Sequence, residues 1–353
     1  MAFRLVWIRL TILALVAAIL PGFSGSGEAA ARDLLGAGAT FPYPLYSKMF
    51  DDYSRRHEVK IRYDASGSGA GIEQIIAKKV DFAGSDAFMS EQEQKDAGAP
   101  ILHIPTCLGA VVITYNLPGN PRLKFTPDLI SDIFLGKVQK WNDPRIGTLN
   151  KEANLPDMGI TVIHRAEASG TTFIFSEYLS KVSREWQDRI GTGKSLSWPV
   201  GRGSKGNPGV AGMVNQIPGA IGYVELVYAL GNGMTVGAVR NKAGGFVDPT
   251  PESVSLSAQV QMTPGASVSL TDTLAPGGYP LSGFTWLLVY KEQNYAGRAR
   301  DRATDLANLL WWVTHEGQRH AAILNYAPLP EESITSAEGM LKSLTFDGRR
   351  LLQ

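Results

Sequence analysis

Three short segments combine glycine with hydroxyl side chains just before a stretch of helical spacing: Gly36–Pro42, Ser66–Gly71 and Ser169–Thr172. A helix that begins at such a segment presents free backbone N–H groups and the positive end of its dipole. Glycine lets a ligand approach the backbone, and serine or threonine adds directional donors. For any one segment, ordinary N-capping is the simpler explanation. Three such segments, with Arg165 close to the third, predict an anion site.

Two charged side chains would give this site its chemistry. Arg165 offers a fixed positive charge and a planar fork that bonds two oxygens. Asp86 is a carboxylate with no proton to give, so it repels an anion unless the anion brings a proton. Hydrogen phosphate brings one at neutral pH, and sulfate does not. The structural alternatives are an ion pair of Arg165 with Glu167 or Asp86, and capping of a turn by Asp86 through Ser90.

Strand, turn and helix units must position these residues. Val59, Ile61 and Tyr63 alternate as a strand, and a helical face follows with Ile72, Ile75, Ile76 and Val80. The same order recurs where a strand reaches Arg165 and a helix starts near Phe173. Further strands and one helix are expected at Ala110–Tyr115, Ala220–Val224, Phe284–Tyr290 and Arg298–Thr314. Strands that alternate with helices indicate an α/β fold.

The length of the chain suggests more than one domain. Of its 353 residues, 44% are hydrophobic and 19% charged, which is typical of a folded globular protein. A chain of this length exceeds the usual size of one core. We expect one lobe from residues 32–107 plus 281–353 and a second from residues 108–280. Asn241–Pro280 is rich in Gly, Pro, Ser and Thr and is interpreted as loops with a return crossing between lobes.

Residues 1–31 have the layout of a secretory signal peptide. Arg4 and Arg9 precede an apolar run at Leu10–Leu20, and small residues end in Ala29–Ala31. A membrane anchor is the alternative, but the run is shorter than the roughly 20 residues that span a bilayer. We expect cleavage before Arg32 and export to the periplasm of a bacterium with an outer membrane.

The composition argues against several classes of protein. The 34 basic and 33 acidic residues leave no positive surplus for binding nucleic acid. The single cysteine, Cys107, and the five histidines show no metal-binding spacing, so neither a metal nor a cofactor is predicted. His103 and His164 flank strands and are interpreted as packing residues rather than catalytic bases.

Two glycine motifs resemble nucleotide-binding signatures without matching them. Gly191–Ser195 ends like a Walker A loop, but Asp188 stands where the first glycine is needed. Gly201–Gly206 has dinucleotide-fingerprint spacing, but Pro208 indicates a loop rather than a helix after it. No serine lies in a Gly-x-Ser-x-Gly elbow. No catalytic residue is therefore predicted.

Longer motifs resemble the high-affinity phosphate-binding proteins of bacterial ABC importers. They include Gly36–Pro42, the Ser68 turn, Asp81–Asp86 and Arg165–Phe173. Supporting matches extend the resemblance to about Pro330 and lie at Gly136–Lys137, Trp141–Pro144, Gly191–Gly193, Gly206–Asn207 and Pro218–Glu225.

The resemblance implies a two-lobed, hinged periplasmic-binding-protein fold of type II, in which each lobe is a mixed sheet flanked by helices. It places inorganic phosphate between the lobes. The phosphate ligands would be Thr40, Phe41 through its N–H, Ser68, Asp86, Arg165, Ser169, Gly170 through its N–H, and Thr171. One departure is Glu167, where relatives commonly carry an aspartate that helps to hold the arginine.

The expected protein is a monomeric receptor that delivers phosphate to the membrane subunits of an ABC importer and performs no catalysis. A receptor for another tetrahedral oxyanion, sulfate or molybdate, is the first alternative, and Asp86 disfavours it. An exported phosphatase is the second. It would need a metal cluster or an activated nucleophile, and the sequence indicates neither.

Overall fold

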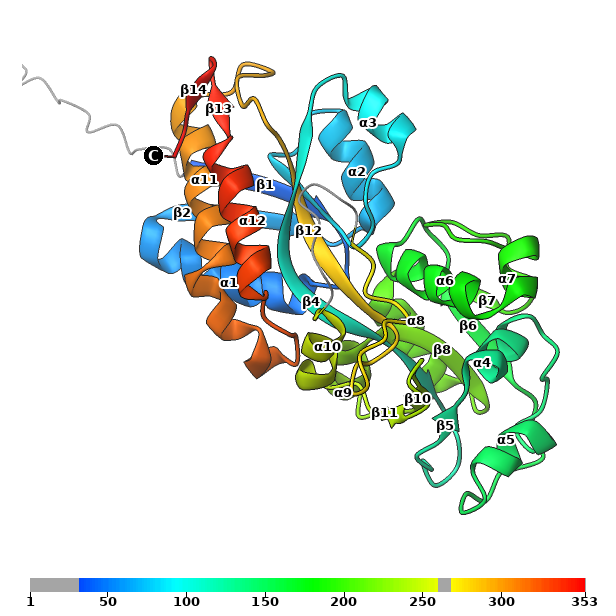
Figure 1. Ribbon diagram of the computed structural model, residues 1–353. Coiled ribbons are helices and arrows are strands. Elements are labelled where there is room, and N and C mark those ends of the chain that lie inside the picture. Colours follow the sequence, from blue (N-terminus) through cyan, green and yellow to red (C-terminus); the bar gives the residue numbers. More distant parts are fainter. Residues whose placement is uncertain (1–31, 260–267, 353) are drawn as a thin grey trace, which may run out of the picture. The chain divides into compact units, whose positions relative to one another are not determined.

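The computed structural model describes residues 32–259 and 268–352 (Figure 1). The predicted signal peptide lies outside these residues. Within them, one mixed sheet has the strand order β2-β1-β3-β12-β4-β8-β6-β7, and β9 also pairs with β4. Its strands are β1 (Arg32–Gly38), β2 (Val59–Asp64), β3 (Phe82–Ser85), β4 (Ile101–Tyr115), β6 (Thr161–Arg165), β7 (Arg202–Ser204), β8 (Ala220–Glu225), β9 (Thr235–Val236) and β12 (Ser282–Tyr290).

Helices follow most of these strands, so the expected α/β class is confirmed. They are α1 (Tyr43–His57), α2 (Ser68–Ile76), α3 (Glu91–Ala97), α4 (Pro127–Phe134), α5 (Pro144–Leu149), α6 (Gly170–Val182), α7 (Arg184–Arg189), α8 (Gly206–Gln216), α9 (Leu226–Gly231), α10 (Pro251–Ser257), α11 (Arg300–Thr314) and α12 (Glu331–Lys342). Short 3₁₀ turns, η1 (Glu316–His320) and η2 (Ala322–Leu324), follow α11. Two smaller sheets comprise β11 (Phe246–Val247), β10 (Ala238–Arg240) and β5 (Lys124–Phe125), and β13 (Thr345–Phe346) with β14 (Arg349–Arg350).

Strands β4 and β12 connect two groups of parallel strands. On one side, β1 is parallel to β2 and β3; on the other, β6 is parallel to β7 and β8. Strand β4 runs antiparallel to β12 over Ile101–Ala110 and to β8 over Val111–Tyr115. The strand expected at 110–115 is therefore the second half of a longer one. Residues 104–115 are buried throughout, so alternation of polar and apolar side chains does not mark where this strand begins.

The β4–β12 ladder is interrupted next to the candidate site. Thr285 pairs with Cys107 and Trp286 with Pro105, so Thr106 is an extra residue on β4. A proline cannot donate a ladder hydrogen bond, and a bulge of this kind redirects nearby side chains. Thr285 lies at this bulge, and its hydroxyl donates to the Asp86 Oδ1 at 2.7 Å.

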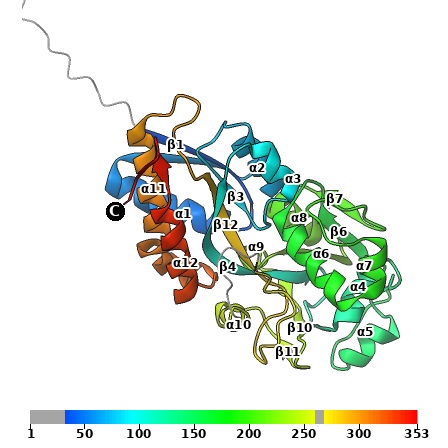
Figure 2. The same cartoon turned by 45° about the horizontal axis from the view of Figure 1, so that its top comes forward.

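The helices bury their apolar faces against this sheet and against each other. Helix α11 packs on α12 and α1, and the three lie side by side in both views (Figures 1 and 2). In α11, the buried residues include Leu306, Leu309, Leu310 and Val313, the positions expected from their helical spacing. The large core also includes the buried, free thiol of Cys107.

Three sequence interpretations were wrong in detail. Helix α8 begins at Gly206, and Pro208 lies in its first turn. The backbone N–H groups of a first turn have no partner within the helix, so a proline there costs no hydrogen bond. The expected loop region 241–280 contains α10, which begins with a capping box formed by Thr250 and Ser253. Val80 lies beyond the end of α2 at Ile76.

No helix in residues 32–259 and 268–352 is both long and apolar enough to cross a membrane. In the same residues, no group of three or more His, Cys, Asp and Glu side chains is arranged to hold a metal ion.

Candidate anion-binding site

The eight predicted ligand residues lie at, or shortly after, the carboxyl ends of parallel strands. Thr40 and Phe41 follow β1, and Ser68 and Asp86 follow β2 and β3. Arg165 ends β6, and Ser169, Gly170 and Thr171 begin the helix after it. Ligands commonly bind at this edge of such sheets. All eight residues are buried, and the seven with side chains have at most 4% of their surface exposed.

Hydrogen bonds connect residues of the two strand groups. The Ser68 Oγ accepts the backbone N–H of Gly170 at 3.0 Å and that of Asp86 at 3.3 Å. A Cβ at Gly170 would lie 2.6 Å from the Asp86 Cβ and 2.6 Å from the Ser68 Oγ. Only glycine fits at this approach. For an anion to accept the Gly170 N–H, it would have to replace the Ser68 Oγ as the acceptor of that N–H.

Arg165 is held in place from two sides. Its Nε donates to the Glu167 Oε1 at 3.0 Å, its Nη2 also pairs with that oxygen, and its Nη1 donates to the Thr171 Oγ1 at 3.1 Å. The Gly206 N–H donates to the same Glu167 oxygen at 2.9 Å. The longer side chain of glutamate therefore still reaches the arginine. The predicted ion pair with Glu167 is confirmed, and it orients the guanidinium.

Asp86 is the buried acceptor of the site. Its Oδ1 accepts the Thr285 hydroxyl at 2.7 Å. Burial raises the pKa of Asp86 to about 7, against the lowering effects of Thr285, Arg165 and Ser68. The alternative role as a cap through Ser90 was wrong, because Ser90 instead forms a capping box with Glu93 at the start of α3.

The N-capping explanation holds for one of the three glycine segments. The Ser169 Oγ accepts the Thr172 N–H at 3.1 Å and caps α6, which leaves its hydroxyl proton available. The caps of α1 and α2, Pro42 and Gly67, make no side-chain capping bond in the described part of the chain. Capping therefore does not explain the hydroxyl residues of the first two segments.

Sequence reasoning missed Asn207, which is fully buried beside the site. Its Nδ2 donates to the Thr40 Oγ1 at 2.9 Å and to the Thr171 Oγ1 at 3.1 Å. It lies in the first turn of α8, after β7, at the same edge of the sheet. The Gly206–Asn207 pair was among the family motifs, but the spacing alone assigned it no contact.

Two further hydroxyl groups, those of Thr285 and Tyr228, donate hydrogen bonds to predicted ligand residues. Besides Thr285, Tyr228 donates its hydroxyl to the Thr40 carbonyl at 2.6 Å. That carbonyl belongs to the same peptide group as the Phe41 N–H, so the bond polarises this N–H as a donor. Their chain separations, 199 residues for Asp86 and Thr285 and 188 for Thr40 and Tyr228, explain why no local motif indicates them.

His103 and His164 make packing contacts, as expected from the sequence. The His103 Nε2 accepts the Met89 N–H at 3.2 Å, and burial lowers its pKa to about 4. The His164 ring stacks on Trp198 at 4.6 Å between centroids.

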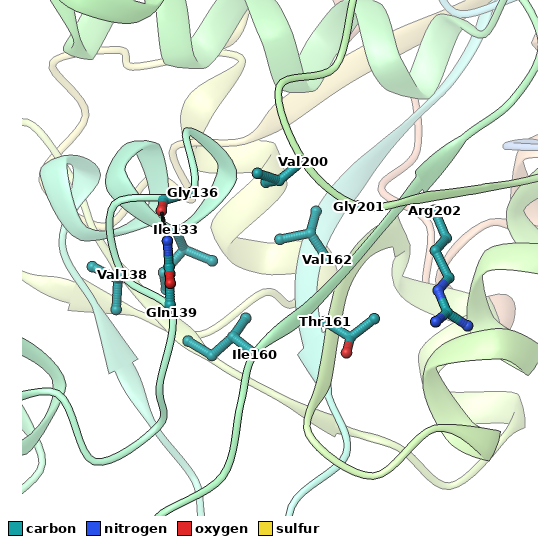
Figure 3. Close-up of a pocket in the computed structure, with 10 residues that line it drawn as sticks. All are labelled: Ile133, Gly136, Val138, Gln139, Ile160, Thr161, Val162, Val200, Gly201 and Arg202. Carbon is teal, nitrogen blue, oxygen red and sulfur yellow. Dashed lines mark hydrogen bonds between the residues drawn. The ribbon is translucent and has the colours of Figure 1, made fainter.

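A separate groove of about 420 Å³ lies between α4 and the strands β6 and β7 (Figure 3). Its lining combines the apolar residues Ile133, Val138, Ile160, Val162 and Val200 with the polar residues Gln139, Thr161 and Arg202. Its lining in the described residues includes none of the eight predicted ligands. The groove is therefore not the predicted anion site.

Comparison with known proteins places this chain in a class and then in a family. The model of the PBP superfamily domain matches residues 24–314. A phosphate-binding protein PstS of Pasteurella multocida is 40% identical over 330 residues, 92% of this chain and 94% of the relative. The corresponding Xylella fastidiosa protein, strain Temecula1, is 42% identical over 86% of this chain and 83% of its own. The chain therefore belongs to the PstS family of phosphate-binding proteins.

Solved structures agree on the fold. A high-affinity periplasmic phosphate-binding protein solved with phosphate superposes with a TM-score of 0.70 at 21% identity, over 87% of this chain and 93% of its own. A putative substrate-binding protein of a phosphate ABC transporter from Clostridium perfringens, also with bound phosphate, gives a TM-score of 0.62 at 20% identity over 84% of this chain and all of its own.

Proposed function

We propose that the protein is a periplasmic receptor that binds inorganic phosphate and delivers it to the membrane subunits of an ABC importer. The observation that carries this proposal is the composition of the buried site. A guanidinium and several N–H and O–H donors lie close to one carboxylate acceptor, Asp86. The names of the relatives support the same ligand.

Each predicted residue has a defined part in binding. Arg165 supplies the positive charge, and the Phe41 and Gly170 N–H groups supply backbone donors at the starts of α1 and α6. Thr40, Ser68, Ser169 and Thr171 donate from their hydroxyls. Because Glu167 already balances the charge of Arg165, the dianion is stabilised mainly by oriented dipoles and hydrogen bonds rather than by net charge.

Asp86 decides between phosphate and its analogues. When it is ionised, above its pKa of about 7, the Asp86 carboxylate accepts a hydrogen bond from the protonated oxygen of hydrogen phosphate, whereas sulfate offers it only lone pairs and meets repulsion. A site built around one such polar contact discriminates by roughly 10⁴ to 10⁵.

The lobes and the export signal belong to the same proposal. Residues 32–107 with 281–353 form one lobe and residues 108–280 the other, and phosphate is gripped between them. The predicted boundaries fall within β4 and just before β12, the two strands that connect the groups of parallel strands. Residues 1–31 direct export and are removed, and the released receptor acts as a monomer.

Calorimetric titration of residues 32–353 tests the proposed function. We expect tight binding of phosphate, and little competition from sulfate or molybdate. An assay with a phosphate ester separates the phosphatase alternative, since a receptor leaves the ester intact. A purified, folded protein that does not bind phosphate would rule the proposal out.

A further inference from the structure

Asn207 contacts two predicted ligand hydroxyls from two different segments. One hydrogen of its amide reaches Thr40, after β1, and the other reaches Thr171, on α6, at 2.9 and 3.1 Å. The backbone N–H of Asn207 also donates to the Thr40 Oγ1 at 3.2 Å. A single buried side chain thus controls the hydrogen bonding of both hydroxyls.

The lone pairs of both hydroxyls are already occupied. A hydroxyl oxygen has two lone pairs and one proton. Thr40 accepts two N–H groups of Asn207, and Thr171 accepts one from Asn207 and one from Arg165 at 3.1 Å. The capacity that remains to each hydroxyl is to donate its proton.

The orientation of the Asn207 amide is determined by a third contact. The backbone N–H of Glu225, at the end of β8, donates to the Asn207 Oδ1 at 2.9 Å. An N–H group requires an oxygen opposite it, so the NH₂ group must face Thr40 and Thr171. If the amide were flipped, its NH₂ group would face the Glu225 N–H.

We infer that Asn207 is a positioning residue that makes the Thr40 and Thr171 hydroxyls obligatory donors and thereby sets which ligand oxygens the site accepts. This inference rests on the proposed function. Two oxygens of the anion must carry lone pairs toward these threonines, and the single protonated oxygen is directed to Asp86. The site thus discriminates between ligands by which of their oxygens carry a proton, as well as by charge and size.

A double-mutant cycle tests this role. Asn207→Ala should weaken phosphate binding about 10- to 100-fold in the parent, because both hydroxyls become free to rotate. In a Thr40→Val/Thr171→Val background, which lacks both hydroxyls, the same change should alter the Kd by less than about threefold. Asn207→Leu, which keeps more side-chain volume, is carried through the same cycle in case the alanine variant does not fold.

Asn241→Ala is the matched control. Asn241 is also buried, and its amide bonds backbone carbonyls, including those of Pro276 and Gly278, in a part of the chain that contains none of the predicted ligands. This variant should lose thermal stability and keep the parent Kd for phosphate.

The outcomes separate this inference from the proposed function. Equal losses from the Asn207 changes in both backgrounds would indicate a purely structural asparagine and overturn the inference, while phosphate binding by the parent would still support the receptor. An Asn207→Leu variant with the parent Kd would also overturn it. If the parent does not bind phosphate, both proposals fail.

Discussion

Among single residues, the ion pair of Arg165 and Glu167 affects both phosphate binding and the free energy of unfolding, and the two effects can be measured separately. Arg165→Met should cost about 3 kcal/mol of phosphate binding, because the anion loses a charge-assisted pair. It should also lower the free energy of unfolding, since Glu167 is left without its cation while one of its oxygens, Oε2, is buried with no hydrogen-bond partner among the described residues. Titration and urea unfolding measure the two effects.

The double variant Arg165→Met/Glu167→Gln separates them. It should recover stability, because no unpaired carboxylate remains, but it should not recover binding. Binding of phosphate within a few-fold of the parent by either variant would place the anion site elsewhere.

Asp86 predicts a pH dependence of stability in the ligand-free protein. Its pKa is raised from 3.8 to about 7, so between these values the folded state holds a proton that the unfolded state has lost. The contribution of Asp86 is therefore fully present below about pH 4 and is lost as the pH rises toward 7, with a slope of at most about 1.4 kcal/mol per pH unit.

Asp86→Asn should remove this component. Urea unfolding of both proteins between pH 4 and 7 would show a shallower decline in the variant, whereas parallel curves would contradict the raised pKa. The pKa of the buried Glu225 is also raised, and Asp86 is one of the causes, so the difference between the two curves includes the coupling of Asp86 to Glu225.

At the scale of elements, the start of α6 must approach the end of β3 closely. Gly170→Ala would place a methyl group 2.6 Å from the Asp86 Cβ and 2.7 Å from its backbone nitrogen. Backbone cannot yield as a flexible side chain does, so α6 must move away. We expect phosphate affinity to fall about 10- to 100-fold, as measured by titration.

Gly212→Ala is the control for this substitution. Gly212 lies inside α8, and no described heavy atom outside its own helix and chain neighbours lies within 4 Å of a Cβ built there. Alanine at this position should raise stability by up to about 1 kcal/mol and leave the Kd unchanged. Unaltered binding by Gly170→Ala would show that the close approach is not needed for the ligand.

At the scale of the whole molecule, contacts cross the proposed boundary between lobes. Ser68 meets Gly170, and outside the ligand residues the Lys194 Nζ pairs with Glu93 at 2.5 Å. A ligand shifts a conformational equilibrium only through contacts that differ between the states, and an anion bound from both sides makes its full set only when the lobes are closed. Small-angle scattering should therefore show a smaller radius of gyration with phosphate. Identical curves, with binding verified, would contradict ligand-driven closure.

The local features of this protein follow from its amino-acid sequence alone. The glycine and hydroxyl segments, the strands that end at Asp64 and Arg165, and the helix ending at Thr314 follow from spacing and propensity within about fifteen residues. The choice of Asp86 as a candidate acceptor also follows from its residue type, whereas its protonation depends on the burial that raises its pKa to about 7. The family motifs added the expectation that these segments share one ligand.

The contacts between distant segments, in contrast, depend on how the chain folds in three dimensions. Asn207 lies 167 residues from Thr40, and Thr285 lies 199 residues from Asp86, so no pattern within a segment encodes either contact. The full length of β4 was also undecidable from alternation, because most of this strand is buried on both faces. The sheet brings the carboxyl ends of β1, β3, β6 and β7 together. This placement gathers donors from separate segments into one site and fixes the directions of their hydrogen bonds.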